Sequence, residues 1–299
     1  MNQNAEHSLI SVARTRPGYH WALEILIFFA VFFVVSIPES LATILVSLLA
    51  GSSDSAQLIG LFLTGILTVG VLVFCRFLQN RSPATLGFRR AHALTEYMTG
   101  ALIGILLLAG AAAICLAAGS IVLMPQSFSA WKWVLFLLGF AVQGMSEEVL
   151  CRGYFLFSVT RKNAVGWGIF LNALCFSLLH LANPGFTPLA FGNIFLFGIL
   201  MSMYVLWRGN LWGVCAIHSF WNFCQGNVFG ISVSGTGVGA SPLSAVQVIG
   251  KTIWHGGTFG IEAGFAVTIV LLIANAIVFL LYRKKECGEN RTERFPPRS

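Results

Sequence analysis

Eight long runs of apolar residues restrict what this chain can fold into. A helix needs about 20 mostly apolar residues to cross the hydrocarbon core of a bilayer, and each run approaches or exceeds that length. The runs cover residues 21–50, 57–78, 97–123, 131–158, 165–181, 189–207, 211–229 and 261–282. Hydrophobic residues make up 57% of the chain and charged residues only 10%, too few to cover a water-soluble particle. We therefore predict an all-α, polytopic transmembrane helix bundle of about eight spans, and we exclude a soluble enzyme and a nucleic-acid binder.

The basic residues predict how this bundle is oriented. If the N-terminus is cytoplasmic and the eight runs alternate in direction, all 18 Lys and Arg residues except Lys132, Arg152 and Lys251 lie on the cytoplasmic side. Such an excess is typical of cytoplasmic loops. The sequence therefore predicts that both termini are cytoplasmic, with an N-terminal segment at 1–20, a membrane domain at 21–282 and a disordered basic tail at 283–299.

One long segment between the last two runs, residues 230–260, is not apolar enough to span. It is rich in Gly and Ser, which favours mobility. We expect it to gate or line substrate access and to pair with an extended substrate strand. A passive external connector is the alternative.

Ionisable side chains within three of the runs break the apolar pattern. Charge is costly at bilayer depth, so such residues mark function by default. The fourth run carries Glu147, Glu148 and Arg152; the fifth carries Phe176 and His180; the seventh carries His218 and Asn222. A lone histidine or a single Glu–Arg pair can be purely structural, but their combination in an apolar chain favours a site.

Helical spacing predicts which of these side chains meet. Glu148 and Arg152 are four residues apart and share a face, so they can form an ion pair. Glu147 projects about 100° away around the helix and is available to another partner. His218 and Asn222 are also four residues apart and can point at one locus, which His180 can close from a separate helix.

This arrangement suits hydrolysis of an acyl group. Glu147 would act as general base on a water that His180 helps to hold, and His218 and Asn222 would stabilise the oxyanion. The alternative is a zinc site with Glu147, His180 and His218 as ligands. The chain lacks an H-E-x-x-H motif, and we favour the version without metal or other cofactor.

At these residues the chain resembles the CAAX protease and bacteriocin-processing family, which includes the type II CAAX prenyl endopeptidases. The family pattern is EExxxR, FxxxH and HxxxN/D on three helices, and here it reads Glu147-Glu148…Arg152, Phe176…His180 and His218…Asn222. The resemblance is most specific over residues 141–264, where the chain is similar to a bacterial branch of the family. It implies that the residues matching Glu147 and His180 activate water and that those matching His218 and Asn222 form the oxyanion site.

The resemblance implies an intramembrane endopeptidase of the bacterial plasma membrane. Its partners would be membrane lipid and a membrane-associated or lipidated peptide, with no nucleic acid. The alternative is a non-proteolytic scaffold or bacteriocin-immunity protein that binds a partner through the same polar helices. A transporter is a third interpretation, suggested by the buried Glu–Arg pair, but the sequence shows no inverted repeat.

Overall fold

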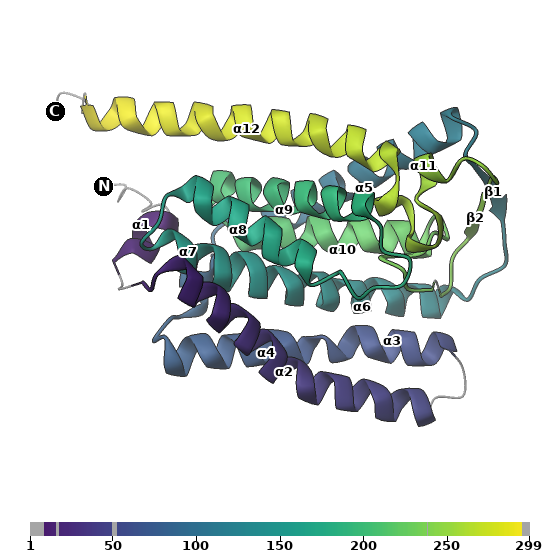
Figure 1. Ribbon diagram of the computed structural model, residues 1–299, viewed down its shortest axis with the longest axis horizontal. Coiled ribbons are helices and arrows are strands. Elements are labelled where there is room, and N and C mark those ends of the chain that lie inside the picture. The colour runs from purple at the N-terminus through teal and green to yellow at the C-terminus, as the bar shows by residue number, and fades with distance from the viewer. Residues whose placement is uncertain (1–8, 16–17, 50–52, 238, 295–299) are drawn as a thin grey trace.

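The computed structural model describes residues 9–15, 18–49, 53–237 and 239–294, and it is a bundle of helices that run along one long axis (Figure 1). The predicted polytopic helical bundle is thereby confirmed. The α-helices are α1 Leu9–Arg14, α2 Trp21–Leu49, α3 Ser53–Leu63, α4 Gly65–Val73, α5 Ala93–Ala117, α6 Ala130–Glu148, α7 Phe157–Thr160, α8 Val165–Leu178, α9 Pro188–Arg208, α10 Leu211–Asn227, α11 Thr252–His255 and α12 Phe265–Arg294.

Shorter helical segments join or extend these helices. Two π-helices, η1 Phe74–Leu78 and η3 Val149–Leu156, continue α4 and α6, and three 3-10 helices are η2 Pro83–Leu86, η4 Gly257–Phe259 and η5 Ile261–Ala263. Continuous helix therefore runs from residue 130 to residue 160 through the polar motif of the fourth predicted run.

Six helical stretches in the described part of the chain are long and apolar enough to cross a membrane. They are Trp21–Leu49, Asp54–Leu78, Ala93–Ala117, Ala130–Thr160, Pro188–Arg208 and Phe265–Lys285. The other two predicted runs form the shorter helices α8 and α10, of 14 and 17 residues. A multi-pass membrane protein follows from the six stretches, whereas eight spans and cytoplasmic termini stay predictions.

Small residues bring the helices around α10 into close contact. A side chain at Gly100 or Gly104 of α5 would collide with the backbone carbonyl of Gly213 or Ile217 of α10. On the other side, a Cβ at Gly144 of α6 would lie 2.5 Å from the Ser219 hydroxyl of α10. Glycines at such positions let membrane helices approach backbone to backbone. Helix α10 is consequently buried along nearly its whole length, so it needs no continuous lipid-facing surface.

Two predictions about the ends and connections need correction. The helical bundle carries one small two-stranded sheet, in which β1 Ile121–Pro125 and β2 Leu243–Gln247 pair antiparallel, with Ile121 opposite Gln247. The predicted third span therefore ends at Ala117, and residues 121–123 belong to the strand instead. Helix α12 runs to Arg294, so residues 283–294 are helical and not disordered, as suits their content of good helix formers. Residues 1–8 and 295–299 lie outside the described part of the chain.

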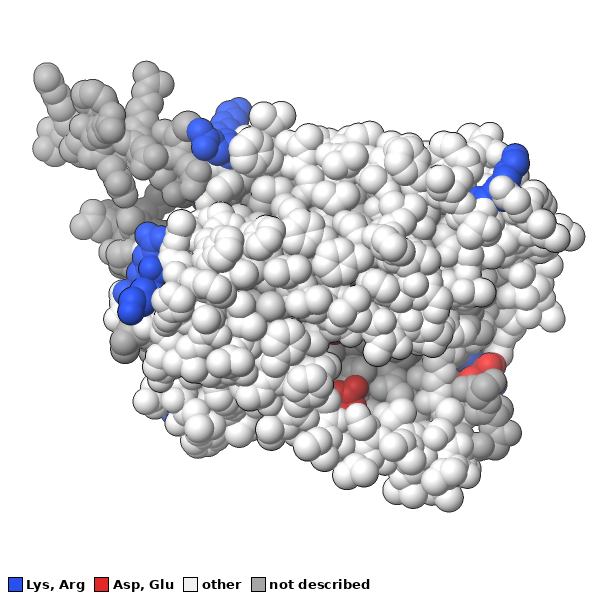
Figure 2. Space-filling model, viewed as in Figure 1, with Lys and Arg blue, Asp and Glu red and all other residues white. Residues whose placement is uncertain are grey.

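The surface matches a position within a bilayer. On the face that Figure 2 shows, charged side chains gather near the two ends of the long axis, and the middle carries only an acidic side chain in a hollow. Helix α2 exposes many large apolar side chains along its length, including Leu26, Phe33, Leu41 and Leu48. Such a surface is stable in contact with lipid and would aggregate in water.

Candidate active site

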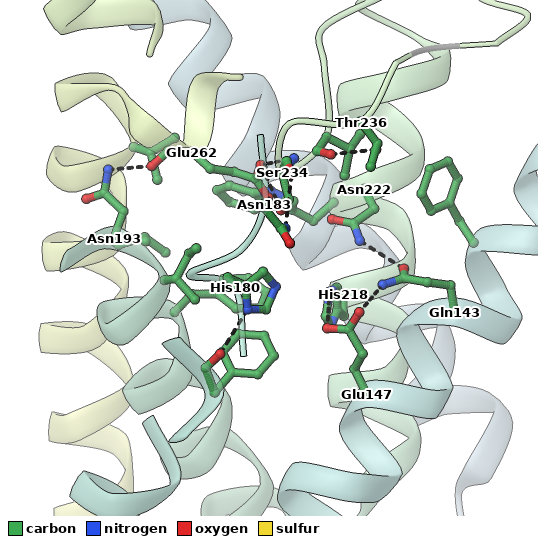
Figure 3. Close-up of a pocket in the computed structure, with 18 of the residues that line it drawn as sticks. Gln143, Glu147, His180, Asn183, Asn193, His218, Asn222, Ser234, Thr236 and Glu262 are labelled. Carbon is green, nitrogen blue, oxygen red and sulfur yellow. Dashed lines mark hydrogen bonds and ion pairs between the residues drawn. The ribbon is translucent and has the colours of Figure 1, made fainter. Parts of the chain in front are cut away.

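A cavity of about 190 Å³ lies where α6, α9 and α10 meet the chain that follows α8 (Figure 3). One part of its wall is apolar and includes Leu61, Phe140, Phe176, Ile194, Phe197, Trp221, Val267 and Leu271. The polar part consists of Gln143, Glu147, His180, Asn183, Asn193, His218, Asn222, Ser234, Thr236 and Glu262. All four residues that the sequence predicts as catalytic therefore line one cavity.

The two neighbouring glutamates of α6 point in different directions, as their helical spacing predicts. Glu148 is fully buried and pairs with the equally buried Arg152, with 2.8 Å between Oε1 and the guanidinium nitrogen. The Glu147 side chain is 28% exposed and faces the cavity. Arg152 belongs to the π-helix η3, a feature that is frequent at functional sites.

Phe176 connects this ion pair to His180. The guanidinium carbon of Arg152 lies 4.3 Å from the centre of the Phe176 ring, a geometry that stabilises a buried cation. The backbone carbonyl of Phe176 lies 2.8 Å from His180 Nδ1, and the two rings meet edge to face at 4.9 Å. Phe176 thus supports Arg152 and orients His180 at the same time.

His218 lies between the two glutamates. Its Nδ1 is 2.9 Å from Glu148 Oε1, the oxygen that also binds Arg152, and its Nε2 is 3.8 Å from Glu147 Oε2. Sequence reasoning assigned Glu148 only to Arg152. The structure adds that Glu148 fixes the ring of His218, so that Nε2 is directed toward Glu147.

Gln143 is a site residue that sequence reasoning missed. Asn222 donates from Nδ2 to Gln143 Oε1 at 2.9 Å, and Gln143 in turn donates from Nε2 to Glu147 Oε1. Glu147 Oε2 makes no hydrogen bond with any described residue. The signal for Gln143 was present, because an amide one turn before Glu147 in an apolar helix must share its face.

A second polar group, around Glu262, was also missed. Its members are Asn183, Asn193, Ser234, Thr236 and Glu262, and they line the cavity beyond His180 (Figure 3). Asn193 donates to the backbone carbonyls of Glu262 and Gly264 at 2.7 and 2.9 Å. No helical motif links these residues, so local spacing gives no sign that they meet.

Residues 230–260, which the sequence predicts to gate or line substrate access, begin with a turn that is hydrogen-bonded to the rest of the chain. Ile231 donates to Gln225, Val233 and Thr236 bond each other, and Gly235 donates to Phe259. The Ser232 carbonyl accepts from Gln225. Val233, Ser234 and Thr236 line the cavity, so the segment contributes to the wall of the site, and its pairing with a substrate strand stays a prediction.

A metal ion would need several donor side chains at one point of the cavity. In the described part of the chain, no three His, Cys, Asp or Glu side chains come together closely enough to hold a metal ion. Both His180 Nδ1 and His218 Nδ1 are engaged in hydrogen bonds with protein oxygens. The nitrogens that remain for chemistry are the two Nε2 atoms.

A protein-family model matches one part of the chain. Residues 129–224 match the family model described as type II CAAX prenyl endopeptidase Rce1-like. No curated protein and no solved structure matches the chain. The matched segment contains all three motifs, so the resemblance stated from the sequence is confirmed there. It supports a protease function of the CAAX type, directed at membrane-associated peptides.

Proposed function

We propose that this protein is an intramembrane endopeptidase of the bacterial plasma membrane in which Glu147 activates the attacking water. The observation that carries the proposal is the position of Glu147 Oε2. It faces the cavity with no hydrogen bond to a described residue, while Oε1 is held by Gln143. A general base must be oriented in this way and still have an oxygen available for the proton.

His180 is suited to hold the water. The Phe176 carbonyl can only accept a hydrogen bond, so its contact with Nδ1 requires the proton on Nδ1. Nε2 then carries a lone pair and can accept from a water molecule. Figure 3 shows His180 across the cavity from Glu147 and His218, so a water between them can contact both His180 and Glu147.

His218 and Asn222 would stabilise the oxyanion. The Glu148 carboxylate accepts from His218 Nδ1, so Nε2 can donate only when the ring carries both protons. The negative carboxylates of Glu147 and Glu148 flank the ring on its two nitrogens and favour that charged form. Asn222 uses one amide hydrogen for Gln143 and retains a second for the substrate.

In the proposed reaction, Glu147 carries one proton from the water to the leaving amine. The water oxygen bonds to the scissile carbonyl carbon while Glu147 takes its proton, and the carbonyl oxygen becomes an oxyanion near His218 and Asn222. As the oxyanion collapses, the carbon–nitrogen bond breaks and Glu147 transfers the proton to the leaving amine. The apolar wall would hold lipid-like or apolar parts of the substrate.

The first test is Glu147→Gln in purified protein, assayed against a library of membrane-associated peptides. General-base catalysis contributes about 10²- to 10⁴-fold to rate, so we expect a loss of that size in kcat. Glu24→Gln is the matched control, because Glu24 is buried but lies in α2 away from the cavity. Undiminished cleavage by Glu147→Gln would refute the glutamate mechanism. A wild-type chain that binds peptides without cleaving any would favour the scaffold or immunity interpretation.

A second test addresses zinc, with Glu147, His180 and His218 as the alternative ligands. We expect exhaustive chelation to leave cleavage intact and elemental analysis of active protein to show much less than one zinc per chain. The opposite result would be one zinc per chain that is lost together with activity on chelation, with activity restored by Zn²⁺ alone. Glu147 would then be a metal ligand and not the group that activates water.

A further inference from the structure

Glu262 is a carboxylate of the cavity wall that the proposed mechanism does not use. It lies in η5, ahead of α12. Its Oε2 accepts from the Ser234 backbone amide at 2.6 Å and from Gln225 Nε2 at 3.0 Å, and its Oε1 accepts from the Ser234 hydroxyl at 3.1 Å. The Ser234 amide and Gln225 Nε2 can only donate, so the position favours a side chain whose oxygens accept.

These hydrogen bonds hold the turn formed by residues 233–236 in a strained shape. Ser234 has φ +47°, a left-handed conformation that costs free energy in residues other than glycine. The next residue, Gly235, has φ +83°, and a side chain there would collide with the Pro184 carbonyl. The turn therefore packs closely against the loop that follows His180. The hydrogen bonds of Glu262 offset the free-energy cost of the left-handed backbone at Ser234.

The turn is also bonded to that loop. Asn183 donates from Nδ2 to the Ser234 carbonyl at 3.0 Å, and its backbone amide donates to the His180 carbonyl at 3.0 Å. A continuous series of hydrogen bonds thus runs from Glu262 through Ser234 and Asn183 to His180. Both ends of the series face the same cavity (Figure 3).

The hydrogen bonds of Glu262 also bear on its burial. Burial raises the pKa of the Glu262 carboxyl above its usual range, while its hydrogen bonds to Ser234 and Gln225 act in the opposite direction. A buried carboxylate is costly unless it is hydrogen-bonded in this way, so Glu262 depends on its contacts with the turn.

We propose that Glu262 is a positioning residue for His180, acting through the Ser234 turn and Asn183. This inference rests on the proposed function, in which His180 holds the attacking water. A displacement of about 1 Å in a reacting group can reduce the rate by 10²-fold. A loosened turn would therefore be visible in kcat, even though the proposed mechanism gives Glu262 no contact with the attacking water.

The kinetic test uses Glu262→Gln, which keeps the size of the side chain but replaces one accepting oxygen with an amide nitrogen that donates. We expect kcat to fall about 10- to 100-fold, by the same positional argument, with little change in KM. Asn183→Ala should give a similar loss. The double variant should lose little more than either single variant, because both changes interrupt one series of contacts. Additive losses would overturn the proposed route.

The matched control is Glu96→Gln. Glu96 is buried, but its carboxylate pairs with Arg208 where α5 and α9 meet, and it does not line the cavity. We expect it to lower thermal stability in detergent without lowering kcat. Equal effects of Glu96→Gln and Glu262→Gln on kcat would reduce the role of Glu262 to general stability.

Amide hydrogen exchange supplies a readout that does not depend on proteolysis. In Glu262→Gln we expect faster exchange in peptides covering residues 231–236 and also in those covering 180–186, whereas Glu96→Gln should change neither. Unchanged exchange over 180–186 would overturn the positioning role, even in an active protease. If the wild-type chain cleaves nothing, the proposed function fails, and exchange at 180–186 still decides whether Glu262 positions His180.

Discussion

Among single residues, Arg152 is a fully buried cation with several partners around the site. It is fully buried, pairs with Glu148, lies over the ring of Phe176 and approaches the Gly198 carbonyl at 3.4 Å. Glu148 in turn holds His218. Removing Arg152 would therefore leave a buried carboxylate beside a proposed catalytic histidine without its main counter-charge.

We expect Arg152→Ala to be more damaging than Arg152→Lys. Breaking a buried ion pair from one side costs about 3–5 kcal/mol, because the remaining charge is buried alone. Lysine retains the charge but loses the planar fork that lets arginine bind Glu148 and stack on Phe176. The measurement is the folded yield and the thermal unfolding midpoint of each variant in the same detergent. An Arg152→Ala protein as stable as wild type would contradict this role.

The residues of the site differ in how far sequence could identify them. Glu147, Glu148, Arg152, His218 and Asn222 were predictable because helical spacing determines their relative directions. Gln143 was predictable in principle from the same spacing. Glu262 was not predictable from helical spacing. Its partners Ser234 and Gln225 meet it only in the folded chain, and local periodicity does not encode such long-range contacts.

At the scale of elements, the site depends on how closely α6 approaches α10. Gly144 lies one turn before Glu148, and Ser219 follows His218 directly, so this close contact of the two helices adjoins the Glu148–His218 hydrogen bond. The 2.9 Å length of that bond requires that nothing larger than hydrogen stand at Gly144.

We therefore expect Gly144→Ala to separate the two helices. Overpacking of this kind typically costs about 1–3 kcal/mol, and the longer distance from Glu148 to His218 should lower kcat as well. Gly166→Ala is the matched control, because a Cβ at Gly166 of α8 would meet no neighbouring atom within 4 Å. The measurements are cleavage rate and thermal midpoint for both variants. Wild-type kcat in Gly144→Ala would show that the site tolerates a wider helix spacing.

Two other elements explain why the sequence prediction was incomplete. The π-helix η3 leaves backbone carbonyls without their usual partners, and Arg81 donates to those of Gly153 and Tyr154 at 3.0 and 3.3 Å. The strand β1 exists because β2, distant in sequence, lies beside it. Both features depend on tertiary contacts, so an apolar run by itself predicts an ordinary helix in each place.

For the whole molecule, the arrangement in the bilayer depends on whether the two short helices cross it. At 1.5 Å per residue, α8 is only ~21 Å long and α10 ~25 Å, below the ~30 Å of the hydrocarbon core. Helix α10 is enclosed by its neighbours, and local thinning of the bilayer accommodates short spans at modest cost. In the predicted eight-span arrangement, which places most basic residues on the cytoplasmic side, both helices cross.

The last prediction tests this arrangement with single cysteines on two exposed connections. Lys162 precedes α8, and Ile249 follows β2 with 99% of its surface exposed. Three helices, α8, α9 and α10, separate these positions. If all three cross, Lys162→Cys is cytoplasmic and Ile249→Cys is external, so a membrane-impermeant maleimide should label only Ile249→Cys in intact cells and both variants in opened membranes. Six native cysteines are buried, and Cys287→Ser provides the background. Labelling of both variants from the same side would show that one of the short helices does not cross, and the predicted eight-span topology would be wrong.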